Sequence, residues 1–586
     1  MILKALADYY QRLADDEHAD LPPYGFEDKP IPFLLVVNDL GRLVNILDTR
    51  SREGTRKSAR VFRLPLGEKK TSGIKANLLW DNPQYVLGGP KSERAKDQKK
   101  ARDAQEAFQS RLARDLNGID DRGVHMLLNF YEGDGISQVR RHPFFKDVMD
   151  ANANLTFMLD GDDRLVAQRP KVVERIRSLY EESQGEPRVS AVSGDVDDVA
   201  VLHTAIKGVW GAQTSGANIV SFNDDAYCSH GKTKKDQGLN APIGKHNEFA
   251  YTTALNYLLA SENQRMQVGD ASTVFWAKNL CDFEADFRSF LAPKKGEEAV
   301  SYEKIRALLA AVKTGIPPEE SRLPFYVLGL APNASRIAIR FWYDGNVKEI
   351  KERVAIHFED IGMIRAPHDP EFLSLFQLLV STALEQKADN IPPNLGGEVA
   401  RAILAGTSYP RTLLANAIRR CKAEQRVPFA RASTIRGVLA RNARLSKSKE
   451  KEVGMSLDRG YDNIGYVLGR LFAMLERIQE QAQGRSLNKT IRDTYFGGAA
   501  SSPQVVFKRL LDLSVHHLSK IRNSGKSAVW LEKELGAIIA LMPKEGAPAT
   551  LDLEDQGRFA VGYYHQRQDF FTKKETVETE EENTHE

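Results

Sequence analysis

The chain has 586 residues, of which 42% are hydrophobic and 27% are charged, a composition typical of globular proteins. Its 82 basic and 79 acidic residues leave a net charge of only +3, which excludes uniformly polyanionic or polycationic chains. The length predicts several domains or subdomains, each able to bury its own core.

The N-terminus, MILKALADYYQRLADD, interrupts its apolar residues with charges and does not resemble a signal peptide. No stretch approaches the roughly 20 consecutive apolar residues that span a bilayer. The three cysteines, Cys228, Cys281 and Cys421, are widely spaced and form no CxxC pair. This spacing argues against a disulfide framework or a zinc ribbon. We therefore predict a cytoplasmic protein with no membrane partner.

The N-terminal part, residues 1–365, mixes helical and strand periodicity. In chain order, the patterns predict a helix over 1–16, a hairpin over 31–48, a charged helix over 91–115, a hairpin over 154–168, a helix over 248–259, two strands over 322–345 and a helix over 346–357. This order predicts an α/β-rich N-terminal part with small β-sheets.

Helical periodicity dominates beyond the turn PHDPEF at 367–372. Apolar residues follow one helical face in GYDNIGYVLGRLFAMLERIQEQ (460–481) and again in VVFKRLLDLSVHHLSKI (505–521). The last residues, KKETVETEEENTHE, are acidic and poor in apolar side chains, which is typical of a solvated tail. The predicted fold class is α+β, with the N-terminal part followed by an all-helical C-terminal bundle over 366–586.

Catalytic motifs are missing from the sequence, which contains no HExxH, no GxSxG and no dinucleotide fingerprint. Two groups of carboxylates could bind Mg²⁺ in a metal-dependent nuclease: Asp160, Asp162 and Asp163, and Asp195, Asp197 and Asp198. Both groups coincide with predicted turns, where aspartate is common for conformational reasons. We predict no catalytic residue, no metal site and no cofactor, and keep the nuclease as an alternative.

Basic residues are concentrated between residues 401 and 451, where thirteen lysines and arginines face only Glu424 and Glu450. Such an excess repels itself unless an anion neutralises it, and a phosphodiester backbone is a natural partner. Two arginines also alternate with apolar residues in the predicted strand SRIAIRFWY. The candidate contacts to a nucleic-acid backbone are Arg336, Arg340, Arg411, Arg419, Arg420, Lys422, Arg436 and Arg441.

A second basic section covers residues 51–77, where eight basic residues face only Glu53 and Glu68. Its end, TSGIKAN, places hydroxyls, a glycine, a cation and an amide within seven residues. Glycine lets a ligand approach the backbone, and lysine and asparagine can bond to base edges. The candidate DNA contacts here are Ser72, Gly73, Lys75 and Asn77.

A polar stretch directly before the predicted helix at 248–259 has a similar mixture of amides, glycines and cations. Its candidate DNA contacts are Asn223, His230, Gly231, Lys232, Gln237 and Asn240. A long solvated loop with asparagine in its turns is the alternative interpretation of this stretch. Two loops of this kind in one chain favour a nucleic-acid partner.

Several long segments resemble the Csd-type large subunit of the type I-C CRISPR Cascade. They are TSGIKANLLWDNPQYVLG (71–88), TAIKGVWGAQTSGANIVSFN (204–223), SFNDDAYCSHGKTKKDQGLNAPIGKHNEFAYTTALNYLL (221–259), FYVLGLAPNASRIAIRFW (325–342) and GRFAVGYYHQRQDFF (557–571). The resemblance implies a non-catalytic subunit that recognises the PAM in double-stranded DNA, promotes unwinding and stabilises the R-loop. It also implies four kinds of partner: target DNA, a guide-RNA ribonucleoprotein, other Cascade subunits including the backbone and small subunits, and a recruited helicase–nuclease. A structural protein that binds guide RNA is a third hypothesis.

The C-terminal helices resemble the small subunit of Cascade complexes, which in type I-C systems is expected from an internal start in the same gene. Lys451, Glu452 and Val453 can be encoded AAG-GAG-GTG, a ribosome-binding sequence just ahead of Met455. We therefore predict that Met455 also begins a separate piece of 132 residues, 455–586. The alternative is that Met455 is an ordinary residue after a charged linker.

Overall fold

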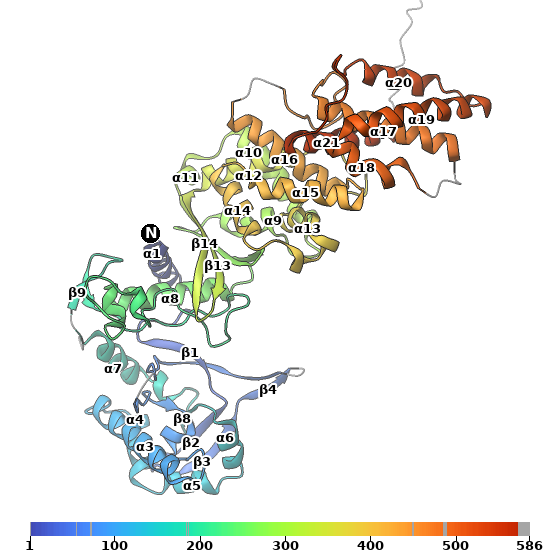
Figure 1. The fold of residues 1–586 in the computed structure, drawn as a ribbon. Helices are drawn as coiled ribbons and strands as arrows, with labels where there is room; N and C mark the ends of the chain where they lie inside the picture. The colour runs from blue at the N-terminus through green and yellow to red at the C-terminus, as the bar shows by residue number, and fades with distance from the viewer. Residues whose placement is uncertain are drawn as a thin grey trace, which may run out of the picture. The chain divides into compact units, whose positions relative to one another are not determined.

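The computed structural model describes residues 2–53, 56–70, 73–182, 185, 187–447, 451–484 and 489–571 (Figure 1). The predicted α+β class is confirmed, because helices and small sheets share the chain up to residue 346 and only helices follow among the described residues. The chain folds into two compact units. The first contains Met1–Ala205 and Val220–Leu255, and the second contains Ile206–Ile219 and Asn256–Glu586.

The first unit is built on a four-stranded sheet with the strand order β3-β2-β8-β7. Its central strand β2 (Phe33–Val37) is buried along its whole length, as expected for the apolar run FLLVV. It pairs antiparallel with β3 (Leu43–Asp48) and parallel with β8 (Leu155–Leu159), and β8 pairs with β7 (Trp80–Asp81). The helices α3 (Ala95–Asp115) and α4 (Arg122–Glu132) contribute Phe108 and Phe130 to the core around this sheet.

Shorter elements complete the first unit. Its remaining helices and strands are α1 (Ile2–Ala14), β1 (Phe26–Pro30), β4 (Arg50–Glu53), β5 (Arg56–Ala59), β6 (Val61–Pro65), α2 (Pro83–Val86), α5 (Gly135–Arg141), α6 (Phe145–Ala151), η1 (Val166–Gln168), α7 (Pro170–Glu181), β9 (Pro187–Val189), β10 (Val196–Asp198), η2 (Asp225–Tyr227), η3 (Gln237–Asn240) and the first part of α8 (Lys245–Ala260). Of the predicted 154–168 hairpin, the first strand is β8; after a turn the chain returns to form a single antiparallel bridge between Met158 and Leu165, and the 3₁₀ helix η1 follows.

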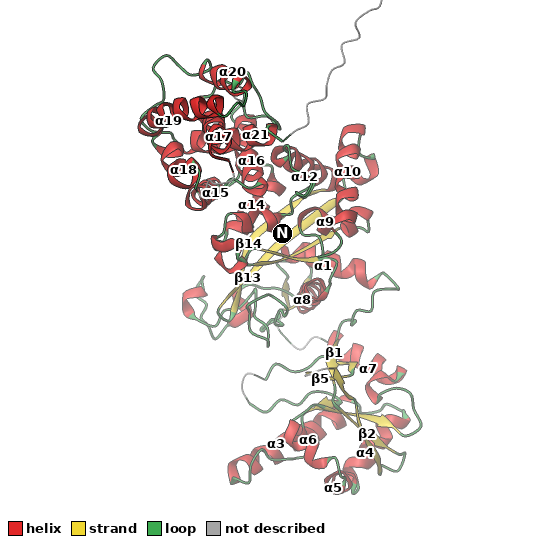
Figure 2. Cartoon of the chain, turned by 90° about the vertical axis from the view of Figure 1, so that its right-hand side faces the viewer, coloured by secondary structure: helices red, strands yellow, loops and turns green. Residues whose placement is uncertain are grey.

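The second unit contains an antiparallel sheet with the strand order β11-β12-β13-β14 (Figure 2). Its strands are β11 (Arg265–Val268), β12 (Ala271–Ala277), β13 (Pro324–Asn333) and β14 (Arg336–Asn346). The predicted pair over 322–345 is thus confirmed as β13 and β14, which are joined at Ala334, a residue with a positive φ of 53°. Phe275, Phe325 and Phe341 face the helices that cover one side of this sheet.

Those helices and the ones that follow form the remainder of the second unit. They are α9 (Asp282–Leu291), α10 (Glu298–Thr314), α11 (Pro318–Ser321), α12 (Val347–Ile361), α13 (Leu375–Ser381), η4 (Leu384–Gln386), η5 (Ala388–Asn390), α14 (Leu395–Ala405), α15 (Arg411–Glu424), α16 (Phe429–Leu445), α17 (Ile464–Gln483), α18 (Ile491–Ser501), α19 (Pro503–Asn523), α20 (Val529–Ile539) and α21 (Leu553–Asp569). No helix in the described part of the chain is long and apolar enough to cross a membrane.

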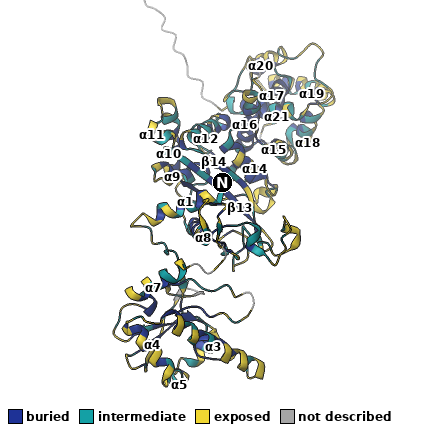
Figure 3. Cartoon of the chain, turned by 90° about the vertical axis from the view of Figure 1, so that its left-hand side faces the viewer, coloured by how far each residue is buried: buried dark blue, intermediate teal, exposed yellow. Residues whose placement is uncertain are grey.

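Helices α17 and α21 lie at the centre of the C-terminal bundle and are largely buried (Figure 3). Glycines allow this close packing: a Cβ atom on Gly469 would lie 2.1 Å from the carbonyl oxygen of Phe559. The same holds for Gly562, whose Cβ would lie 2.3 Å from the oxygen of Tyr466. Gly469 and Gly562 therefore mark the line along which the backbones of α17 and α21 meet.

The predicted boundary at 365/366 lies inside the second unit. One hydrophobic core contains Phe325 and Phe341 from the sheet together with Leu378, Leu414 and Phe472 from later helices. Helix α14 packs directly on β14, so helices from beyond residue 366 cover the sheet from before it. The change from mixed to helical structure therefore occurs within one packed body.

Candidate nucleic-acid interface

A groove of about 970 Å³ in the first unit brings together two of the residues predicted to contact DNA, Lys75 and Gln237. Lys75 belongs to the segment between β6 and β7, and its side chain is exposed. Gln237 begins η3 in a left-handed conformation, with φ of 42°. The two loops that the sequence singled out therefore meet at one concave surface.

The loop that carries Lys75 is braced at its base by Asn77. The side chain of Asn77 is buried, and its Oδ1 accepts a hydrogen bond of 2.9 Å from the backbone N–H of Glu68. The backbone N–H of Asn77 donates a hydrogen bond of 2.9 Å to Oδ2 of Asp81. This is a correction to the sequence analysis: Asn77 holds the loop in shape, and its amide does not face a base edge.

Asp81 is the residue that this brace depends on, and the sequence analysis did not identify it. Its carboxylate is 1% exposed and lies 2.6 Å from Nζ of Lys70 through each of its two oxygens. The backbone N–H of Asn82 donates to Oδ1 at 2.8 Å. Asp81 thus binds both ends of the 70–77 segment. The only sequence signal was an acidic residue directly after the apolar run LLW.

A second group of contacts joins the groove wall to the first turn of α8. Nζ of Lys69 contacts the carbonyl oxygen of Leu202 and lies 3.5 Å from Oε1 of Glu248. The buried Glu248 carboxylate also accepts the backbone N–H of Thr204. Burial lowers the pKa of Lys69, and Glu248 opposes this shift. These contacts hold the 199–204 segment against the segment that leads to Lys75.

The polar stretch at 223–240 presents several of its predicted residues to solvent. Asn223, His230 and Gly231 are exposed and Lys232 is half-exposed. His230 and Gly231 both have positive φ, 55° and 73°, so they form a turn at the tip of the loop. Of the six residues predicted here, Gln237 is the one that lines the groove with Lys75.

Asn240 has a structural role in this loop. Its Nδ2 donates to the carbonyl oxygens of Gln237 at 2.9 Å and Thr233 at 3.2 Å. Its amide nitrogen is therefore occupied within the loop, which corrects its assignment as a direct base contact. Gly73 fits its predicted role better, because it is exposed, has φ of 75° and has open space around its Cα. Ser72 lies outside the described residues.

The two arginines predicted on a strand both lie on β14. The guanidinium of Arg340 is paired with the carboxylate of Asp270 at 2.7 Å, so its charge is already neutralised. Arg336 is half-exposed and begins β14, where it pairs with Asn333 and adjoins Asn218. Neither arginine lies in the unit that carries Lys75.

The structure gives Arg436 and Arg441 a different role from the predicted contact with a nucleic-acid backbone. Arg441 is fully buried, and its Nε donates to Oδ2 of Asp360 at 2.7 Å. Arg436 is buried as well and donates to the carbonyl oxygens of Glu359 and Gly454, each at 2.9 Å. Both guanidinium groups satisfy acceptors at the end of α12, so neither is available to a phosphate.

Helix α15 carries the other four predicted cations of this region. Arg411 and Arg419 are exposed, and Nη2 of Arg419 donates to Asn416 at 2.8 Å. Lys422 is half-buried beside Gln556 at 3.2 Å, and it lines a surface cavity of about 520 Å³ with Arg419. Arg420 has a side chain only 13% exposed. Arg411, Arg419 and Lys422 thus remain accessible to an anion.

Several of the carboxylates proposed for the nuclease alternative contact basic residues. Asp162 pairs with Arg169, Asp198 pairs with Lys245 at 3.0 Å, and Asp197 lies 3.1 Å from Nδ1 of His246. Over the described ranges, no three His, Cys, Asp or Glu side chains are grouped so that they could hold a metal ion. Asp197 and Asp198 belong to β10, so their contacts tie that strand to the start of α8.

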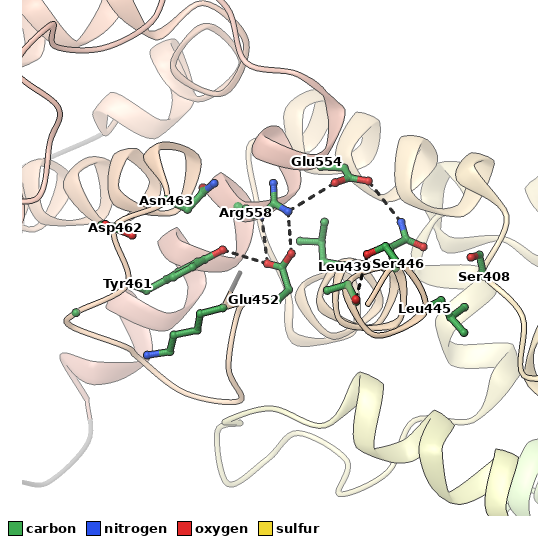
Figure 4. A pocket seen from close by; sticks show the side chains of 14 residues that line it. Ser408, Leu439, Leu445, Ser446, Glu452, Tyr461, Asp462, Asn463, Glu554 and Arg558 are labelled. Atoms are coloured by element: carbon green, nitrogen blue, oxygen red, sulfur yellow. Dashed lines mark hydrogen bonds and ion pairs between the residues drawn. The ribbon is translucent and has the colours of Figure 1, made fainter. Parts of the chain in front are cut away.

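The segment before Met455 is packed into the second unit rather than being a loose linker. The carboxylate of Glu452 receives Nη2 of Arg558 at 2.7 Å and the hydroxyl of Tyr461 at 3.2 Å (Figure 4). Val453 is buried, and the carbonyl oxygen of Met455 accepts the N–H of Ile364 at 2.7 Å. A cavity of about 940 Å³ lies beside this network. Residues on both sides of Met455 thus share contacts.

Comparison with known proteins assigns the family. A family model described as CRISPR-associated protein (Cas_Csd1) matches residues 6–571, which is nearly the whole chain. No match was found among curated proteins. The matched range includes both loops at the groove, the sheet of the second unit and the C-terminal bundle. The chain belongs to the Cas_Csd1 family of CRISPR-associated proteins.

Proposed function

We propose that this CRISPR-associated protein is the non-catalytic large subunit of a type I-C Cascade in the cytoplasm. In this role it recognises the PAM in double-stranded DNA, promotes unwinding and stabilises the R-loop, and it helps to recruit a helicase–nuclease. The observation that carries the proposal is the groove that places Lys75 and Gln237 together. A lysine and an amide on one concave surface can bind a phosphate and a base edge at the same time.

The way the groove is built supports a role in recognising the PAM. Asp81, Lys70 and Asn77 fix the loop from below, while Gly73 and Lys75 project from it. A loop whose shape is set before binding loses little conformational freedom when it meets a ligand. The exposed cations of α15, Arg411 and Arg419, supply backbone contacts for the opened strands or for guide RNA.

The test is binding of the reconstituted complex to a duplex library with a randomised motif beside the guide-matched site. We expect the wild-type complex to select a short motif, and Lys75→Ala and Gln237→Ala to weaken or change that selection. Lys99→Ala is the matched control, because it removes an equally exposed lysine from α3. Unchanged selection in both groove variants would place the reading surface elsewhere.

We also propose that Met455 starts a separate small subunit, 455–586. Within the full chain this piece shares a core with α15 and α16: a Cβ on Gly557 would lie 3.1 Å from Ile435 and 3.4 Å from Leu414. A free piece must therefore cover this face of α21 with another partner, and a Cascade subunit is the candidate. Expression of Met455→Leu, followed by mass spectrometry, should abolish the smaller product. Its persistence would assign the product to proteolysis.

A further inference from the structure

Trp210 is the most exposed of the five tryptophans described in this chain. Its side chain is 60% exposed, whereas Trp80 and Trp276 are buried and Trp530 is 38% exposed. Across the described residues, no aromatic ring is in contact with the indole of Trp210. An indole left in water costs free energy unless a partner covers it, so its position calls for an explanation.

The loop that carries Trp210 is held in a defined shape within the second unit. Ile206 and Ala217 exchange two backbone hydrogen bonds, of 2.8 and 3.0 Å, which close the loop at its base. The backbone N–H of Trp210 donates a hydrogen bond of 2.9 Å to Oγ of Ser272, a fully buried residue of β12. The backbone that presents the indole is thus fixed to the central sheet.

Contacts on either side of the indole add to this rigidity. The N–H of Lys207 donates to Oδ1 of Asn256 at 2.8 Å, and the side chain of Val209 is buried. Gly208 and Gly211 adopt positive φ of 85° and 76°, conformations that residues with a side chain rarely adopt. The two glycines let the backbone turn sharply on either side of Val209 and Trp210. Ordering the loop on a ligand therefore requires little further loss of entropy.

The surroundings of the indole indicate which partner it takes. Its exposed neighbours along the loop carry no large apolar side chain; they are Lys207, Gly208, Gly211, Gln213, Thr214 and Ser215. A tryptophan that docks another protein usually lies inside an apolar, water-excluding rim. No acidic residue occurs between Val199 and Asn223, so nothing in the loop repels an anion.

We propose that Trp210 is a stacking platform for an unpaired nucleobase, with Lys207 of the same loop as a contact for the adjoining phosphate. Every base has a π-face, so such a platform accepts single-stranded nucleic acid with little dependence on sequence. This inference rests on the proposed nucleic-acid function, and it assigns to the second unit a contact for opened strands.

The test uses the full-length chain and two labelled strands of equal length, one of oligothymidylate and one of abasic sites. The abasic strand keeps every phosphate and removes every base. We expect Trp210→Ala to weaken oligothymidylate binding by about five- to 150-fold, the range for one lost base stack, and to leave binding of the abasic strand unchanged. Trp210→Phe retains a ring and should recover most of the affinity.

Trp530→Ala is the matched control, because it removes a partly exposed tryptophan from α20, and we expect it to change neither affinity. Equal loss on both strands in Trp210→Ala, or no loss on either, would overturn the platform alone. Failure of the wild-type chain to bind either strand would overturn both the platform and the strand-binding part of the proposed function. Selection of a duplex motif by the complex is a separate measurement, so the two failures can be told apart.

Discussion

Two segments of this chain, 51–77 and 401–451, each carry far more basic than acidic residues. The basic side chains of the two segments differ in what they contact. In the first, Lys75 projects into a groove while Lys70 binds Asp81 below it. In the second, Arg436 and Arg441 turn inward to the end of α12. The last carbonyl groups of a helix have no partners within it, and a guanidinium can satisfy several of them. A local excess of basic residues therefore indicates that these residues bind anions or hydrogen-bond acceptors. The acceptors can be groups of the folded chain itself.

The largest expected effect is that of Arg441→Ala on stability. Asp360 is 2% exposed, and removal of Arg441 leaves its carboxylate with Arg444 as its remaining cation. Breaking a buried ion pair in this way costs about 3–5 kcal/mol of unfolding free energy. Urea denaturation followed by circular dichroism measures the change. The control is Arg411→Ala, an exposed arginine of the same segment, whose loss should cost under about 0.5 kcal/mol.

Normal stability of Arg441→Ala together with weaker binding to nucleic acid would contradict the distinction between the two segments. That result would mean that the guanidinium leaves the core to reach a phosphate.

The next effect concerns acid stability around the 401–451 segment. His357 is buried, hydrogen-bonded to the hydroxyl of Tyr409 at 2.6 Å, and burial together with Arg441 lowers the pKa of His357 to about 3. An unfolded histidine titrates near 6.5, so between these values the unfolded state binds more protons. Stability should fall as the pH drops below about 6.5, by about 1.4 kcal/mol per pH unit for this group.

The measurement is the urea midpoint as a function of pH for wild type and His357→Gln. The variant, which has no titrating ring, should show a shallower decline between pH 6 and 4. Identical slopes would mean that His357 is protonated in the folded protein.

A smaller effect is expected for Asp81→Asn in the first segment. The substitution keeps the size of the side chain but removes the negative charge that Lys70 and two backbone N–H groups share. We expect a loss of about 1–3 kcal/mol in stability and a weaker motif selection by the complex. Asp163→Asn, which alters an exposed carboxylate, is the control. Unaltered selection would show that the 70–77 loop needs no brace.

The smallest effect on stability is expected for Lys75→Ala, because its side chain is exposed and the loop is fixed by other residues. The unfolding free energy should change by less than about 0.5 kcal/mol. Duplex affinity should fall, and the slope of log affinity against log salt should become shallower by about one. A salt titration of binding measures this slope, and an unchanged value would remove Lys75 from the DNA path.

Part of this architecture could be predicted from local pattern. The pattern over 31–48 predicted a hairpin, and β2 and β3 form one. The pair of β-rich runs around Pro332 and Asn333 predicted the β13–β14 hairpin. The stripe that begins at Ile464 predicted α17. These elements depend on contacts between residues close in sequence, so periodicity is sufficient to locate them.

The candidate site was predictable only in part. Gly73 and Lys75 are exposed on a loop, as the composition of TSGIKAN indicated, whereas Asn77 and Asn240 brace the two loops from within. An asparagine that reads a base and one that satisfies its own loop have the same sequence signature, because both depend on the same amide chemistry. Which of the two occurs depends on how the loop folds back on itself, since the side-chain partners of both asparagines lie within nine residues of them.

The sequence by itself determined the α+β composition, the family and the two loops rich in amides and glycines. Each of these depends on residues that are close together along the chain. Tertiary structure alone decided that Lys75 meets Gln237, that Arg441 meets Asp360 and that α14 covers β14. These contacts join residues 162, 81 and about 60 positions apart. Buried charges must be paired and apolar faces must be covered, and only the completed fold determines which distant residue fulfils each requirement.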